Sequence, residues 1–167
     1  MKSKGPHIIS VDVFIEIPKG SRNKYEYDPA KGAIRFDRTL FSSVHYPGDY
    51  GFIENTLGKD GDPLDALVLM KEHTFPGCIV RARPVGILKM EDEKGEDDKV
   101  LCVPIGDPEW NSVRNLADIP NALRNEIENF FQTYKILEGK KVKVHGWKDR
   151  KAAVKVIRIA QEDLKNR

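Results

Sequence analysis

The stretch Val11-Asp12-Val13-Phe14-Ile15-Glu16-Ile17 alternates aliphatic side chains with others. Because the aliphatic residues recur at every second position, they predict a β-strand with one buried face, which ends at Pro18-Lys19-Gly20. Many short strands separated by Gly and Pro turns are typical of a small barrel or sandwich. Further strands are expected at residues 24–27, 33–36, 66–70, 79–89 and 99–105.

The last third of the chain has a helical pattern instead. Apolar residues recur at three- and four-residue spacing from Leu123 to Leu137, which predicts a helix with Asp118 as its N-cap and Gly139 at its end. A second helix is expected at about residues 151–164 on the same kind of evidence.

The composition bounds the class of protein. The 167 residues are 40% apolar and 32% charged, which predicts one soluble, globular domain over residues 1–167. The expected strands and helices make its class mainly β (α+β). The net charge of +2 gives no argument for nucleic-acid binding, and no apolar run approaches the roughly 20 residues of a membrane helix. Cys78 and Cys102 form no C-x-x-C pair, so we expect no zinc site or disulfide framework and a reducing cytoplasm.

The hexapeptide Asp60-Gly61-Asp62-Pro63-Leu64-Asp65 places three carboxylates within six residues. Like charges so close repel one another, and a divalent cation between them would offset that repulsion. Oxygen ligands without Cys or His indicate a hard metal, with Mg²⁺ first and Mn²⁺ close behind. A solvated acidic turn explains this stretch equally well, because Asp-Gly and Asp-Pro are turn dipeptides.

A second acidic cluster occupies residues 92–98, between two expected strands. The spacing predicts a hairpin with Lys94-Gly95 near its tip, and taken alone the charges favour a solvated tip. The alternative is that Asp92 and Asp97 add metal ligands, since strand ends from distant parts of a small barrel can converge. An EF-hand is excluded, because the twelfth residue counted from Asp60 is Lys71 rather than Glu.

Single basic and aromatic residues are ambiguous at this level. Lysines and arginines are most often surface residues, and Tyr134 falls on the apolar stripe of its helix, which favours a core position. Tyr46 and Tyr50 lie in a segment of loop composition, residues 45–51, where an exposed tyrosine is more often functional. No Walker or dinucleotide glycine motif is present, so Gly-rich phosphate binding is not supported.

Taken in order, these segments resemble the soluble inorganic pyrophosphatases of family I in their short prokaryotic form. The signature D-[G/S/N]-D-P-[aliphatic]-D stands at Asp60–Asp65, and the resemblance covers essentially the whole chain. The other matching segments are Glu16-Ile17-Pro18, Lys24-Tyr25-Glu26, Asp37-Arg38, Tyr46 to Gly51, Arg83 to Lys99 and Phe130 to Lys135. Ile105 to Trp110 differs from the family's usual loop, which bears on local structure or subunit contacts.

The resemblance implies a role for each candidate residue. Asp62 would be the general base. Asp60, Asp65 and Asp97 would hold one Mg²⁺, and Asp92, Asp97 and Glu26 would face the metal ions that arrive with pyrophosphate. The residues that would hold the phosphates are Lys24, Arg38, Tyr50, Tyr134 and Lys135, with Tyr46 nearby. Lys99 would brace the acidic cluster, with Glu16 and Glu93 in support.

The resemblance also implies a fold, a reaction and an assembly. We expect a five-stranded, OB-like closed β-barrel with two flanking C-terminal α-helices, assembled as a homohexamer. The expected reaction is Mg²⁺-dependent hydrolysis of pyrophosphate by water, with no nucleic-acid or membrane partner. The alternatives are an OB-type nucleic-acid-binding module without catalysis, a phosphohydrolase acting on nucleotides, and an inactive scaffold.

Overall fold

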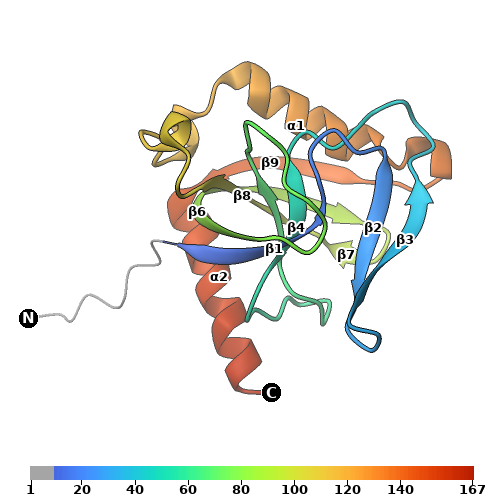
Figure 1. Ribbon diagram of the computed structural model, residues 1–167, viewed down its shortest axis with the longest axis horizontal. Helices are drawn as coiled ribbons and strands as arrows, with labels where there is room; N and C mark the ends of the chain where they lie inside the picture. Colours follow the sequence, from blue (N-terminus) through green and yellow to red (C-terminus); the bar gives the residue numbers. More distant parts are fainter. Residues whose placement is uncertain (1–9) are drawn as a thin grey trace, which may run out of the picture.

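The computed structural model describes residues 10–167, which form a mixed α+β fold that is mainly sheet (Figure 1). The strands are β1 (Val11–Ile17), β2 (Asn23–Asp28), β3 (Ala33–Thr39), β4 (Asp49–Ile53), β5 (Asp65–Val68), β6 (Ile79–Asp92), β7 (Gly95–Glu96), β8 (Lys99–Pro104) and β9 (Lys143–Asp149). The helices are α1 (Asn121–Thr133) and α2 (Arg150–Lys165), with short 3₁₀ turns η1 (Pro108–Trp110), η2 (Leu116–Asp118) and η3 (Ile136–Glu138).

Five strands pair in a ring. β1 pairs with β4, β4 with β5, β5 with β8, β8 with β6, and β6 returns to β1. The β5–β8 pairing is parallel and the other four are antiparallel. β7 and β9 extend the sheet from β6, whereas β2 and β3 form a separate two-stranded sheet, which lies at the side of the ring in Figure 1.

Both faces of the central strands are buried, because each helix packs on a different set of side chains. Along β5, Leu67 joins a cluster with the α1 residues Phe130 and Phe131, whereas Ala66 and Val68 join a cluster with Ala153 and Ile157 of α2. The predicted alternation holds in β1, whereas β5 and β8 are buried on both faces and do not alternate.

The structure corrects several predicted elements. Residues 49–53, expected as loop, form β4, and residues 143–149 form β9, which was not expected. Asp118 is not the N-cap of the helix: it ends η2 and accepts the N–H groups of Arg114 and Asn115, and α1 begins one residue after Pro120. No helix within residues 10–167 is long and apolar enough to cross a membrane.

Candidate active site

The acidic signature forms a tight loop between β4 and β5. The Asp62 N–H donates to Oδ1 of Asp60 at 3.0 Å, and the Gly58 N–H donates to the Asp62 carbonyl at 2.7 Å. A Cβ atom on Gly58 would lie 3.0 Å from that carbonyl oxygen, so glycine allows the loop to close. The loop is joined to the ring through Thr56, whose Oγ1 donates to the Ile53 carbonyl and accepts the Leu64 N–H.

The Lys99 ammonium lies at the centre of the site. The parallel pairing of β5 and β8 sets Asp65 directly beside Lys99, although 34 residues separate them. Lys99 Nζ donates to Asp65 Oδ2 at 2.8 Å, to Asp97 Oδ1 at 2.9 Å and to the Tyr50 hydroxyl at 2.9 Å. The lysine is 3% exposed; its burial alone would lower its pKa, but the two carboxylates outweigh that effect and raise it.

Several neighbouring carboxylates have raised pKa values, mainly because they are buried. Burial raises the pKa of Asp97 to about 6, and the charge of Asp65 adds to this effect while Lys99 opposes it. The pKa of Asp62 is raised by burial and then by the charges of Asp60 and Asp65. Burial also raises the pKa of Glu16 to about 7, against the lowering effect of the Tyr27 N–H that Glu16 accepts at 2.8 Å. These acids would bind a cation favourably.

The hairpin predicted at residues 92–98 is present, and Asp92 near its tip is one of the acids that it turns inward. Asp92 pairs with Gly95 across the tip, and its carboxylate lies 3.3 Å from Lys135 Nζ and accepts the Lys94 N–H at 2.9 Å. Burial raises the pKa of Asp92, but the Lys94 N–H and the Lys135 charge lower it further, so the net shift is downward. Glu93 is exposed at the tip.

Two predicted phosphate ligands lie opposite each other on the β2–β3 hairpin. Lys24 pairs in register with Arg38 and forms ion pairs with Glu26 and with Asp37, the latter at 3.5 Å. Arg38 contacts Asp37 through Nη1, and its Nε lies 2.9 Å from Glu138 at the end of η3. The structure therefore does not place Lys24 and Arg38 in direct contact with Lys99, although Lys24 and Asp65 are both near enough to Glu16 to shift its pKa.

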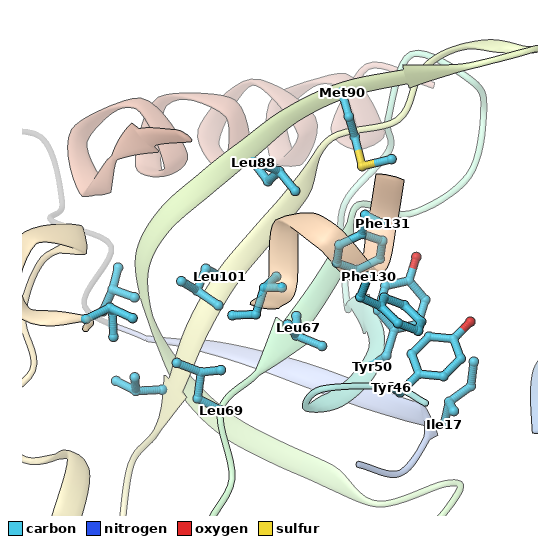
Figure 2. Packing of buried hydrophobic residues seen from close by; sticks show 14 of the residues in the cluster. Ile17, Tyr46, Tyr50, Leu67, Leu69, Leu88, Met90, Leu101, Phe130 and Phe131 are labelled. Atoms are coloured by element: carbon cyan, nitrogen blue, oxygen red, sulfur yellow. The ribbon is translucent and has the colours of Figure 1, made fainter. Parts of the chain in front are cut away.

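The three candidate tyrosines are buried, which contradicts the expectation that Tyr46 and Tyr50 are exposed on a loop. Tyr46 is 1%, Tyr50 9% and Tyr134 4% exposed. Figure 2 shows Tyr46 and Tyr50 beside Phe130 and Phe131, with ring centroids 4.7 Å apart for Tyr46 and Phe130. Burial raises the pKa of Tyr46 and Tyr50 well above the usual range, so both hydroxyls stay protonated and can donate hydrogen bonds.

Three further acids take part, which the sequence analysis did not single out. Asp37 and Glu138 hold the Arg38 guanidinium, and Asp98 accepts the Met90 N–H at 3.1 Å and pairs with Lys89. Asp37 was named from the sequence as part of the Asp37-Arg38 segment, but no role was expected for it. Glu138 could not have been predicted, because its contact depends on where α1 ends relative to the hairpin.

The donor set fits a hard divalent cation. Asp60, Asp62, Asp65, Asp92 and Asp97 offer carboxylate oxygens, the ligands that Mg²⁺ and Mn²⁺ prefer. Within residues 10–167, no three His, Cys, Asp or Glu side chains are arranged as a metal site, since Lys99 occupies the position between Asp65 and Asp97. Burial is the main cause of the raised pKa values of Asp62 and Asp97, and the charges of neighbouring acids add to it.

Comparisons with known proteins identify the family of the chain. The chain is 58% identical over 150 residues to an inorganic pyrophosphatase of Methanosarcina mazei, covering 90% of this chain and 89% of the relative. The crystal structure of inorganic pyrophosphatase from Thermus thermophilus superposes with a TM-score of 0.92 at 49% identity, covering 98% of this chain and 94% of that one. A Helicobacter pylori inorganic pyrophosphatase superposes with the same TM-score at 43% identity and 99% coverage of both chains. Because the inorganic pyrophosphatase sequence model also matches residues 13–165, the chain belongs to the inorganic pyrophosphatase family.

Proposed function

We propose that this protein hydrolyses inorganic pyrophosphate to two orthophosphates by direct attack of water. The observation that carries the proposal is the convergence of Asp65, Asp97 and Tyr50 on Lys99, beside the Asp92–Lys135 pair. Such a site combines carboxylate oxygens that can hold metal ions with lysines that can hold phosphate. Family membership supports the same reaction.

We propose that the cofactor is Mg²⁺, with Mn²⁺ as a possible substitute. Asp60, Asp65 and Asp97 would hold one ion, while Asp92, Asp97 and Glu26 would face the ions that accompany pyrophosphate. When bound, such ions lower the pKa of water and neutralise phosphate charge. The residues of the chain supply the rest.

Asp62 is proposed as the general base that takes the proton from the attacking water. Its raised pKa moves it toward the range in which a carboxylate accepts a proton efficiently. After burial, the charges of Asp60 and Asp65 contribute to that shift. The acids that would bind the metal ion therefore also raise the pKa of the proposed base.

The basic and phenolic groups are proposed to bind and orient the two phosphates. Phosphoryl transfer depends mainly on positioning and charge stabilisation, which rigid donors provide. The proposed phosphate ligands are Lys24, Arg38, Tyr50, Tyr134 and Lys135, with Tyr46 nearby. Lys99 holds Asp65 and Asp97 through the contacts described above. Glu16 and Glu93, at the hairpin tip, are proposed as supporting residues.

The remaining proposals concern architecture and setting. We propose that residues 1–167 form one domain, that the five-strand ring is an OB-like closed barrel, and that the chain assembles as a homohexamer in the cytoplasm. The cyclic strand pairing and the long match to short bacterial relatives support the first two. No nucleic-acid or membrane partner is proposed, because acidic groups at the site would repel a phosphate backbone.

The test is phosphate release from pyrophosphate by the full chain, with Mg²⁺ and with EDTA. We expect metal-dependent turnover that falls by about 10²-fold or more in Asp62→Asn, as for the loss of a general base, and also collapses in Asp65→Asn. Glu126→Gln, an exposed acid on α1, is the matched control and should retain full activity. A wild type that is inert with every divalent ion would overturn the proposal. Nucleoside triphosphates and single-stranded DNA, tested in parallel, separate the two alternative functions.

A further inference from the structure

Glu138 is an acid with a buried side chain and no part in the proposed mechanism. It lies in η3, three residues after Lys135, and its side chain is 5% exposed. Its Oε1 lies 2.9 Å from Arg38 Nε on β3 and 3.9 Å from Lys140 Nζ. Its other oxygen, Oε2, is buried and accepts no hydrogen bond within residues 10–167. Because a buried carboxylate is costly unless it is paired, Arg38, the nearer cation, is the partner that compensates its burial.

Two carboxylates set the orientation of the Arg38 guanidinium. Asp37 contacts Nη1 and Glu138 contacts Nε, whereas Nη2 donates no hydrogen bond to any residue from 10 to 167. Burial alone would lower the pKa of Arg38, but Glu138 and then Asp37 outweigh that effect and raise it. Glu138 is therefore the stronger of the two partners, and the arrangement leaves Nη2 available to a phosphate oxygen.

The backbone of η3 ties Glu138 to a second proposed phosphate ligand, Lys135. The Glu138 N–H donates to the Lys135 carbonyl at 3.1 Å, and the Lys140 N–H donates to the same carbonyl at 3.3 Å. The Lys135 ammonium in turn lies 3.3 Å from the Asp92 carboxylate. The separation of Glu138 and Lys135 is therefore set by a hydrogen-bonded turn.

These contacts form one path across the site. The path runs from Asp92 to Lys135, along η3 to Glu138, and from Glu138 to Arg38 on the β2–β3 hairpin. No residue of β3 is buried, so packing of that strand alone does not determine where Arg38 points. The Glu138 contact therefore joins a cation on the exposed hairpin to the turn that carries Lys135.

We propose that Glu138 is a positioning residue for pyrophosphate: it holds Arg38 at a fixed distance from Lys135, so that both cations meet the phosphates of one substrate. This inference rests on the proposed function. A contact of this kind depends on the reach of the acid, because a shorter side chain loses the contact even when it keeps the charge. A simple counter-charge to Arg38 would depend on the charge of residue 138 and much less on its length.

The test uses two substitutions of Glu138 that separate reach from charge. Glu138→Asp keeps the charge but shortens the side chain by one methylene, whereas Glu138→Gln keeps the length and an acceptor oxygen but loses the charge. We expect Glu138→Asp to raise KM for pyrophosphate about tenfold, the usual effect of losing one charge-assisted contact, with kcat within about twofold of the wild type. Glu138→Gln should keep KM within about threefold of the wild-type value.

Lys140→Gln is the control, because Lys140 is the exposed second neighbour of Glu138, and it should leave KM unchanged. An unchanged KM in Glu138→Asp, or an equal rise in Lys140→Gln, would overturn the proposal. A KM that Glu138→Gln lowers below the wild-type value would also overturn it, since the acid would then act only by weakening the attraction of Arg38 for phosphate.

A double-mutant cycle shows whether Glu138 acts through Arg38. In the Arg38→Met background, Glu138→Asp should raise KM by less than about twofold, because the contact is already lost. A further tenfold rise in that background would assign the effect to another residue and contradict the positioning role.

Binding without turnover separates this inference from the proposed function. Imidodiphosphate, in which N–H replaces the bridging oxygen, is titrated calorimetrically with Mg²⁺ into the wild type and both Glu138 variants. Glu138→Asp should weaken its binding about tenfold, with Glu138→Gln close to the wild type. That result in a chain inert toward pyrophosphate refutes the proposed hydrolysis and leaves the positioning role standing. An active wild type whose variants bind and turn over alike refutes the positioning role alone, and a wild type that neither binds nor hydrolyses refutes both.

Discussion

The two sides of the site are built on different supports. Asp65 and Lys99 begin β5 and β8, and every residue of β8 is buried, whereas β3, which carries Arg38, has no buried residue. The acids are therefore fixed by the ring of strands, and the outer cations are carried by a separate two-stranded sheet. The difference shows that one site can combine acids held by the buried ring of strands with cations on an exposed hairpin, whose position depends on fewer packing contacts.

We expect the largest difference between the ring of strands and the β2–β3 hairpin in the unfolding free energy that each loses when a glycine is replaced by alanine. In Gly51→Ala on β4, the new Cβ would lie 1.8 Å from the Phe14 carbonyl oxygen, so backbone must move. We expect a loss of more than about 4 kcal/mol in unfolding free energy, or no folding. Gly32→Ala in the hairpin turn meets no atom within 4 Å and has only the strain of φ +61, about 1–2 kcal/mol. Urea unfolding of both variants tests this, and equal losses would contradict it.

The second largest loss of unfolding free energy is expected when Lys99 is replaced. Lys99→Met leaves Asp65 and Asp97 buried without their partner, which typically costs about 3–5 kcal/mol. The matched change on the hairpin, Lys24→Met, should cost less than about 1 kcal/mol because its ion pairs are more exposed. Urea titrations in EDTA measure both, and a Lys99 variant as stable as the wild type would show that the ring does not depend on this ammonium.

The hairpin should matter for substrate rather than for stability. Arg38→Lys loses the planar guanidinium, and we expect kcat/KM for pyrophosphate to fall about tenfold, mainly through KM, with unfolding free energy unchanged within about 1 kcal/mol. Arg35→Lys is the control, because Arg35 stands on the same strand and pairs with Asp28. An equal effect of both variants, or a stability loss as large as that of Lys99→Met, would remove the distinction between the two halves.

The smallest expected effect concerns the reactivity of the two cysteine thiols, which reports whether the ring of strands opens. Burial raises the pKa of Cys102 on β8 to about 12, from an ordinary value of 9.0. A thiol reagent at pH 8 should therefore label half-buried Cys78 and reach Cys102 only after unfolding. The native thiol keeps its proton at pH values where the unfolded one loses it, so this group lowers the unfolding free energy as pH rises from 9 toward 12. Rapid labelling of both cysteines in the native protein would show that β8 opens.

Secondary structure was easiest to predict where apolar residues recur at a regular spacing along the chain. The alternation of Val11 to Ile17 predicted β1 closely. The helical spacing around Phe130 predicted α1, but its expected end at Gly139 is wrong, because α1 ends at Thr133 and Gly139 follows η3. β4 was missed because its first residues, Asp49 to Gly51, have turn composition, although the ring needs glycine there for close backbone approach. The start of the helix was expected too early, at Asp118. The helix α1 begins at Asn121, directly after Pro120, because Pro120 has no N–H and fits best where a helix begins.

Candidate site residues could be named from the sequence, but their arrangement in space could not. The spacing of Asp60, Asp62 and Asp65 is local and readable, and so is the hairpin of Asp92. The central place of Lys99 depends on the parallel register of β5 and β8, which no local pattern encodes. Tyr50 was expected to be exposed for a similar reason: the aromatic residues that cover it come from α1, far along the chain.

The return of β6 to β1 has a consequence for synthesis. β1 leaves the ribosome first, yet Val11 pairs with Ala82, and Asp65 cannot meet Lys99 until β8 has been made. Lys135 and the α1 aromatics follow later still. A nascent chain therefore carries its acidic loop for some time without the Lys99 ammonium that contacts it. Every truncated product that ends before α1 also lacks Tyr134 and Lys135.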